Sequence, residues 1–231
     1  MTTQPTPPYS DLAAIIPAYN AGKHLAAVID RVAGFVPRGR IVVVDDGSKD
    51  DTRTVAEKSG VVVVVHPENR GKGAAIRSGI SRAQELGVPL AVLLDADGQH
   101  SPDEIPAFVA CQRETDADVV VGNRLENAAN MPWLRKATNY VTSAVVSLLA
   151  GRRVPDSQNG YRLIRLGHFK KFPLTTSRYE IESEMIIRAG RAGGRFASVP
   201  IRTIYAGEAS FINPFVDTMR FLRMVGKSLF W

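Results

Sequence analysis

Asp95 and Asp97 are separated by one residue at the end of an apolar run that is typical of a buried strand. Hard divalent cations such as Mg²⁺ and Mn²⁺ bind carboxylate oxygens together with the oxygens of a bound diphosphate. Because alternate residues of an extended chain point to the same side, Gln99 lies on the side of these two carboxylates. Asp95, Asp97 and Gln99 are therefore the predicted metal ligands, although paired aspartates are also common in loops and helix caps.

Two other polar segments follow apolar runs, at 17–20 (PAYN) and 45–48 (DDGS). A carboxylate in the second segment could accept hydrogen bonds from a nucleobase or a ribose, but Asp, Gly and Ser are also ordinary turn residues. A third segment, at 71–73 (GKG), is either an anion-binding nest or, as we favour, a tight turn followed by a helix cap. It matches neither the P-loop pattern nor a dinucleotide fingerprint.

The elements that must position these segments alternate between strand and helix. The predicted strands are 12–17, 40–45, 61–66, 89–95 and 117–122, and the predicted helices are about 21–35, 50–59, 73–86 and 102–115, the last with a capping box of Ser101 and Glu104. Near-continuous apolar runs are typical of strands that are buried on both faces of a parallel sheet. The pattern predicts a doubly wound α/β sheet, in which the polar segments meet beyond the carboxyl ends of the strands.

The second half of the chain breaks this alternation. We expect an amphipathic helix at 133–149, and then a polar connector and a short strand. The remaining predicted elements are a helix at 180–190, a strand at 195–205 and an amphipathic helix at 213–231. Glu182 and Glu184 are assigned to the solvated face of their helix. The last helix has an apolar stripe and a basic stripe, which fits either a membrane surface or a core-facing helix with a solvated basic face.

Composition narrows the class of protein. The chain has 231 residues, of which 45% are hydrophobic and 23% charged, with a net charge of +6 and a single cysteine, Cys111. This is a globular composition that does not depend on disulfides. No apolar stretch approaches the ~20 residues that span a bilayer, and residues 1–10 predict a disordered leader rather than a signal peptide. The positive charge favours anionic partners, among which nucleic acid ranks last because no basic run or zinc-ligand spacing is present.

Taken in order, the segments IIPAYN, VVVDDGS, NRGKGAAIRSGI, LLDADGQH, VVGNR and NGYRLIR resemble the family 2 glycosyltransferases, which are inverting nucleotide-sugar transferases of the A type. Within that family the chain is most similar to the polyprenyl-phosphate (dolichol-phosphate) mannosyl- and glucosyltransferases. The resemblance implies an A-type glycosyltransferase fold with a mostly parallel, doubly wound sheet and C-terminal amphipathic helices. It also implies one domain at 11–212, with a nucleotide-sugar half at 11–125 and an acceptor half at 126–212, before the helix at 213–231.

The resemblance also implies binding and catalytic roles for residues at positions that match the family's motifs. The implied donor-binding residues are Pro17, Tyr19, Val44, Asp46, Asp95, Ala96, Asp97 and Gln99. The implied acceptor-phosphate residues are Arg124, Arg135, Asn139 and Arg162. Asp97 and Arg124 are the implied catalytic residues. The chain departs from the family pattern at Ala21, where an acidic residue is common, at Asn139, where a serine is common, and at Phe211, where a lysine or histidine commonly follows the serine.

The expected reaction is a metal-dependent inverting transfer of a hexose, from a donor of the GDP-mannose or UDP-glucose type, to a polyprenyl phosphate. A phosphate acceptor is already anionic at neutral pH and needs no strong base, whereas a carbohydrate hydroxyl would need one, for which Asp97 and Asp156 are available. A non-catalytic nucleotide-sugar-binding protein is the third possibility. His100 is a secondary site residue, and His24, His66 and His168 have no partners that the sequence reveals. We expect a cytoplasmic protein that is peripheral on the cytoplasmic face of the membrane.

Overall fold

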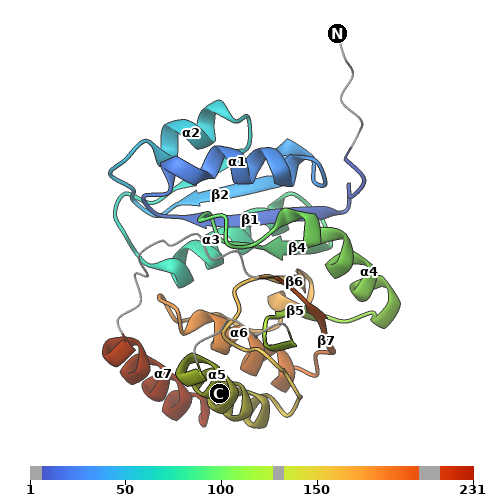
Figure 1. Cartoon of the computed structure of the whole chain (residues 1–231), viewed down its shortest axis with the longest axis vertical. Helices are drawn as coiled ribbons and strands as arrows, with labels where there is room; N and C mark the ends of the chain where they lie inside the picture. Colours follow the sequence, from blue (N-terminus) through green and yellow to red (C-terminus); the bar gives the residue numbers. More distant parts are fainter. Residues whose placement is uncertain (1–6, 127–132, 203–213) are drawn as a thin grey trace.

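A computed structural model describes residues 7–126, 133–202 and 214–231 (Figure 1). Its strands are β1 (Leu12–Ala18), β2 (Ile41–Asp45), β3 (Val62–Val65), β4 (Leu90–Leu93), β5 (Val119–Asn123), β6 (Arg162–Arg165) and β7 (Phe196–Pro200). Its α-helices are α1 (Gly22–Ala33), α2 (Thr52–Lys58), α3 (Lys72–Glu85), α4 (Ile105–Thr115), α5 (Trp133–Ala150), α6 (Ile181–Arg191) and α7 (Pro214–Ser228). Short 3₁₀ turns lie at Arg38–Arg40, Pro102–Glu104 and His168–Lys170.

The strands form one mixed sheet in the order β3-β2-β1-β4-β6-β5-β7. Strands β1 to β4 are parallel, and β7 is parallel to β5, but β6 runs antiparallel to both of its neighbours. The mostly parallel sheet predicted from the sequence is therefore confirmed, with β6 as the reversed strand. Because β6 is reversed, its first residue, Arg162, pairs with Leu93 at the carboxyl end of β4. The connector before β6 thus reaches the edge of the sheet where the carboxyl ends of β1, β2 and β4 lie.

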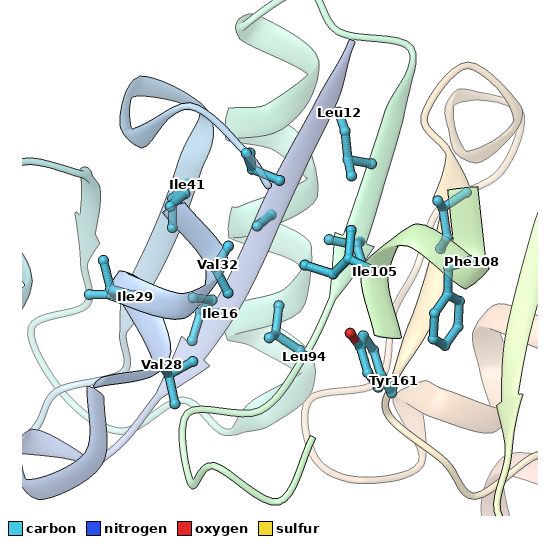
Figure 2. Packing of buried hydrophobic residues seen from close by; sticks show 14 of the residues in the cluster. Leu12, Ile16, Val28, Ile29, Val32, Ile41, Leu94, Ile105, Phe108 and Tyr161 are labelled. Carbon is cyan, nitrogen blue, oxygen red and sulfur yellow. The ribbon is translucent and has the colours of Figure 1, made fainter. Parts of the chain in front are cut away.

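Both faces of the sheet are covered, so the molecule has three layers. Along β1, Leu12, Ala14 and Ile16 belong to the apolar cluster beneath α1 and α4, while Ala13 and Ile15 belong to the cluster beneath α3 and α6. This alternation follows from the two-residue period of a strand. Figure 2 shows the first cluster from close by, with side chains of the sheet packed against those of α1 and α4. Burial of this apolar surface fixes the strand ends where the polar segments begin.

Two expectations from the sequence were wrong, one about the burial of a strand and one about a helix cap. The run at 61–66 was expected to be buried on both faces, but β3 is an edge strand and Val65 is exposed. The capping box of Ser101 and Glu104 does not form, since Ser101 makes no side-chain cap. Instead the Ser101 hydroxyl accepts a hydrogen bond from Arg31, and the Glu104 carboxylate accepts one from the Arg202 amide at 2.8 Å.

The carboxylates of α6 are buried, which overturns their assignment to a solvated face. Glu182 and Glu184 are 7% and 0% exposed. Glu184 accepts hydrogen bonds from the backbone amides and hydroxyls of Thr175 and Thr176, and from Arg188 Nε at 2.8 Å. This satisfied carboxylate ties the segment before α6 to the helix.

The apolar stripe predicted for the last helix, α7, is exposed to solvent. Met219, Leu222 and Leu229 are exposed, whereas Phe221 and Met224 pack into the core. The core-facing alternative is therefore wrong for this stripe. Among the described residues, no helix is both long enough and apolar enough to cross a bilayer.

We predict that Glu184→Gln lowers the free energy of unfolding by about 3 kcal/mol, because the amide leaves the Arg188 guanidinium without its buried counter-charge. Chemical denaturation followed by circular dichroism measures the change. Glu57→Gln is the matched control, since it breaks the exposed ion pair of Glu57 with Arg53, and it should leave stability unchanged. Equal stability of wild type and Glu184→Gln would contradict the prediction.

The same substitution has a predicted pH dependence. Burial raises the pKa of Glu184, but its hydrogen bonds from Thr175, Thr176 and Arg188 outweigh burial and hold that pKa below its ordinary value of 4.5. A depressed pKa in the folded state stabilises the fold above the ordinary pKa and loses that contribution as the pH falls through the folded-state pKa. The stability gap between wild type and Glu184→Gln should therefore be full at pH 7 and shrink below pH 4.5. A gap that is constant between pH 7 and acid would refute this assignment.

Candidate functional site

The segments after β1 and β2 are joined by reciprocal hydrogen bonds. The Asn20 amide donates to Ser48 Oγ at 2.9 Å, and the Lys49 amide donates to Asn20 Oδ1 at 2.9 Å. Pro17 faces Val44 across the parallel ladder. Pro17 and Tyr19 are half-buried, and Val44 is fully buried. The first two predicted polar segments therefore lie together, as the fold class required.

Asp46 is buried and binds the segment that leads into α3. Its carboxylate accepts hydrogen bonds from the amides of Arg70 at 3.0 Å and Gly71 at 2.7 Å. It also lies 2.6 Å from Nδ1 of His66, whose Nε2 is 2.9 Å from Ser78 Oγ. Asp46 and His66 together fix this segment against the end of β2. No local pattern predicts this pairing, because the two residues belong to different strand ends.

Gly71 allows the chain to turn into α3 at this point. It has a φ of 93°, and a Cβ there would collide with the carbonyl oxygen of Ser177. A side chain is excluded on both counts. The segment at 71–73 is therefore a tight turn with a helix start, which confirms the favoured interpretation.

Lys72, the first residue of α3, joins three parts of the fold. Its ammonium lies 2.7 Å from Asp95 Oδ1 and 2.8 Å from Glu182 Oε1. A Cβ on Gly160 would lie 2.9 Å from Glu182 Oε1, 3.0 Å from Lys72 Nζ and 3.3 Å from Asp95 Oδ2. Four elements thus converge on one ion cluster, and the connector before β6 passes close over it at Gly160.

The charges of this cluster stabilise one another. Burial raises the pKa of Asp95, but the nearby Lys72 ammonium, with His100, outweighs burial and lowers that pKa to about 2. Burial lowers the pKa of Lys72, but the carboxylates of Asp95 and Glu182 outweigh burial and raise it above its ordinary value. Asp95 is therefore ionised at neutral pH, and its side chain remains 28% exposed.

Asp97 and Gln99 follow Asp95 in a half-buried turn, while Ala96 is buried. Asp97 Oδ1 accepts a hydrogen bond from the Gln99 amide at 2.9 Å. Among the described residues, no group of three or more His, Cys, Asp or Glu side chains is arranged to hold a metal ion. Two carboxylates at a strand end nevertheless fit Mg²⁺, which is usually held by one or two carboxylates together with substrate phosphates and water.

His100 stabilises the turn rather than offering a base. Its Nδ1 accepts a hydrogen bond from the Asp95 amide at 3.1 Å, and its ring stacks on Tyr161 with centroids 5.0 Å apart. Burial, with the nearby Lys72 and Arg124 cations, lowers the pKa of His100 to about 4 against the attraction of Asp95. The imidazole is therefore neutral at pH 7.

Arg124, directly after β5, forms a bidentate ion pair with Asp156. Its Nε and Nη2 donate to the two carboxylate oxygens at 2.8 Å and 2.9 Å, and its backbone amide donates to Oδ2 at 3.2 Å. The Asn159 side chain donates to the Gly122 carbonyl at 2.6 Å. These bonds join the GNR segment to the connector before β6.

Arg162 is only 1% exposed, and its guanidinium donates to the backbone carbonyls of Glu182 and Asn159. This placement departs from the expected direct contact with an acceptor phosphate. Asn139 is buried on the inner face of α5. Arg135 lies in α5, but its side chain is outside the described residues, as are Ser210 and Phe211.

Sequence reasoning missed Lys72, Glu182 and His66 as parts of this site. A usable signal was present for Glu182, because Met185 and Ile186 follow it by three and four residues and therefore lie on the same face of the helix. A carboxylate on an apolar, core-facing side of a helix must have a partner inside the protein.

Comparisons with known proteins agree with this geometry. Residues 13–176 match the family model described as glycosyl transferase family 2. The chain is 35% identical over 213 residues to a UDP-N-acetylglucosamine–dolichyl-phosphate N-acetylglucosaminyltransferase of Methanococcus voltae, covering 83% of this chain and 84% of that protein. It is 32% identical over 199 residues to an undecaprenyl-phosphate mannosyltransferase of Micrococcus luteus, covering 81% of each.

The fold is shared with a solved structure. Glucosyl-3-phosphoglycerate synthase from Mycobacterium tuberculosis, in complex with Mn²⁺, uridine diphosphate and phosphoglyceric acid, superposes with a TM-score of 0.67 at 20% identity, covering 94% of this chain and 76% of that one. This likeness shows the A-type glycosyltransferase fold. The family model covers most of the chain, and the chain belongs to glycosyl transferase family 2.

Proposed function

We propose that this protein transfers a hexose, with inversion, from a nucleotide diphosphate sugar to a polyprenyl phosphate. The observation that carries the proposal is the meeting of half-exposed Asp95 and Asp97 with Arg124 at one edge of the sheet. Relatives named for transfer to dolichyl and undecaprenyl phosphate support the acceptor class. The donor is of the GDP-mannose or UDP-glucose type.

On this proposal the donor lies along the carboxyl ends of β1, β2 and β4. Pro17 and Tyr19 contact the nucleoside, with Val44 and Asp46 buried beside them. The diphosphate lies at the 95–99 turn. Asp95, Asp97 and Gln99 would hold Mg²⁺ or Mn²⁺, which would supply positive charge near the diphosphate. The solved synthase with Mn²⁺ and uridine diphosphate supports this cofactor class.

The acceptor phosphate is assigned to Arg124, together with Arg135 and Asn139 of α5. A planar guanidinium suits phosphate oxygens, and Asp156 holds that of Arg124 in one orientation. Arg162 acts indirectly, by holding the connector before β6 in shape. A polyprenyl acceptor also places the enzyme at a membrane surface, and we assign it to the cytoplasmic face.

A phosphate acceptor also fits the state of the carboxylates. Asp156 is fully buried and both its oxygens are bonded to Arg124, so it is not placed to take a proton from a hydroxyl group. An anionic phosphate needs no such base. The protein's task is then to hold the nucleophile opposite the leaving diphosphate in a fixed geometry.

We predict metal-dependent transfer of sugar from one member of a panel of radiolabelled GDP- and UDP-sugars to a short-chain polyprenyl phosphate, measured as label in the organic phase. Chelation of the divalent ion should abolish the signal. Asp97→Asn should lower kcat/KM by about 100-fold or more, while Asp103→Asn, an exposed aspartate paired with Arg31, should not. Donor hydrolysis without lipid product would indicate a hydroxyl acceptor, and no turnover with any donor would indicate a binding protein.

We also predict that Arg124→Lys raises the KM for the acceptor and lowers kcat/KM about tenfold to a hundredfold, because an ammonium cannot keep the bidentate pair with Asp156. Steady-state kinetics with varied polyprenyl phosphate measure both constants. Arg165→Lys is the matched control, since Arg165 pairs with Asp118 at the far end of β6. Equal acceptor KM and kcat/KM values for the two variants would contradict the assignment of Arg124 to the acceptor site.

A further inference from the structure

Large apolar side chains gather on one part of the surface. Ten of them are exposed in the described chain, and all but Val65 belong to α5, α7 or the two residues just after α7. These nine are Trp133, Tyr140, Val141, Leu148, Val216, Met219, Leu222, Leu229 and Phe230. Concentrations of this kind mark interaction sites rather than ordinary surface.

Helix α5 exposes large apolar side chains on its outer face, while Val146 and Ala150 on its inner face pack into the core. Trp133, Tyr140 and Leu148 are 79%, 51% and 82% exposed, whereas the polar side chains of Asn139 and Ser143 are buried. A helix on a water-exposed surface normally buries its apolar stripe and exposes its polar one. No charged residue occurs between 137 and 150. Water is therefore a poor environment for the outer face of this helix.

Helix α7 adds positive charge beside its apolar residues. Arg220, Arg223 and Lys227 are exposed. Its one acidic residue, Asp217, pairs with Arg220 at 2.9 Å. Arg152 and Arg153, directly after α5, are also exposed. The surface is thus apolar and cationic, a combination that fits anionic lipid headgroups above an acyl layer.

Both helices are bonded to α6, and we call their combined surface the α5–α7 platform, defined as residues 133–153 and 216–231. The Arg191 guanidinium of α6 donates to the Leu149 carbonyl of α5 and to the Ser228 carbonyl of α7. The Arg188 guanidinium lies 3.9 Å from the centre of the Trp231 ring. Figure 1 shows α5 and α7 together at the end of the molecule opposite α1 and α2.

We propose that the α5–α7 platform docks on an anionic lipid bilayer, with the apolar stripe of α5 entering the headgroup layer and the cations of α7 contacting lipid phosphates. The assignment deepens the proposed function, since a lipid acceptor explains why the enzyme needs such a surface. A second copy of the chain is a poorer occupant. A two-fold contact across this surface would bring Arg220, Arg223 and Lys227 of both copies together, which like-charge repulsion opposes.

The test is vesicle binding by the full chain, without donor or acceptor. Sedimentation with phosphatidylglycerol–phosphatidylcholine vesicles should retain the protein, whereas pure phosphatidylcholine vesicles should retain much less, and added salt should weaken binding. The double substitution Leu148→Glu and Leu222→Glu should reduce binding more than tenfold. Val65→Glu is the control, because Val65 is a 40% exposed apolar residue outside the platform, and it should bind as wild type. Arg223→Gln and Lys227→Gln should each weaken binding roughly fivefold.

Fluorescence gives a second measurement that does not depend on retention. The chain has two tryptophans, and in a Trp231→Phe background the emission reports Trp133 alone. Its spectrum should shift to the blue on anionic vesicles, and brominated lipids should quench it. An unshifted spectrum, or equal retention of the double variant and wild type, overturns the proposal.

Failure of the docking proposal and failure of the proposed function give different results. Vesicle binding without any transfer to polyprenyl phosphate keeps the platform and removes the lipid acceptor. Transfer to a short-chain acceptor without vesicle binding keeps the proposed function and removes the platform. If the double variant instead lowers the solution mass measured by light scattering, with no vesicle binding by wild type, the surface is a contact between copies and the proposal is overturned.

Discussion

One half-buried cation joins three parts of this fold. The Lys72 ammonium is shared by Asp95, just after β4, and Glu182, on α6, and removing Lys72 would leave both carboxylates without this cation. The start of α3, the 95–99 turn and the connector before β6 are all positioned by this contact. The connector passes so close to it at position 160 that a Cβ there would touch all three charged groups.

The first half of the fold could be predicted because its information is local. Apolar runs such as RIVVVD identify strands, and the rule that ligands bind beyond the carboxyl ends of parallel strands brings Asp46 and Asp95 to one edge. The reversal of β6 carries no such signal, because RLIR has the same charged–apolar–apolar–charged pattern in either direction. That reversal is what delivers Asp156 and Gly160 to the site.

Several polar contacts of the fold could not be predicted, because they join residues that lie far apart in the sequence. Lys72 and Glu182 are 110 residues apart in the chain, and no periodic pattern reports that contact. Ser101 and Glu104 have the spacing of a capping box, but Arg31 and the Arg202 amide offer partners that the helix end does not. Glu184 was placed outside for the same reason, since a carboxylate is assigned to solvent until its buried donors are known.

The polar groups of the site divide into those the protein satisfies and those it leaves accessible. Some side chains form their hydrogen bonds with other protein groups, namely those of Asp46, Asp156 and Arg162. These bonds hold in place the half-exposed side chains that can contact a substrate. Helix α5 belongs to both sets. On its inner face Ser143 bonds to Ser157, next to the Asp156 that orients Arg124, while its outer face is the apolar part of the proposed platform. A single helix therefore links the surface proposed to meet the bilayer with the arginine proposed to bind the phosphate of a lipid.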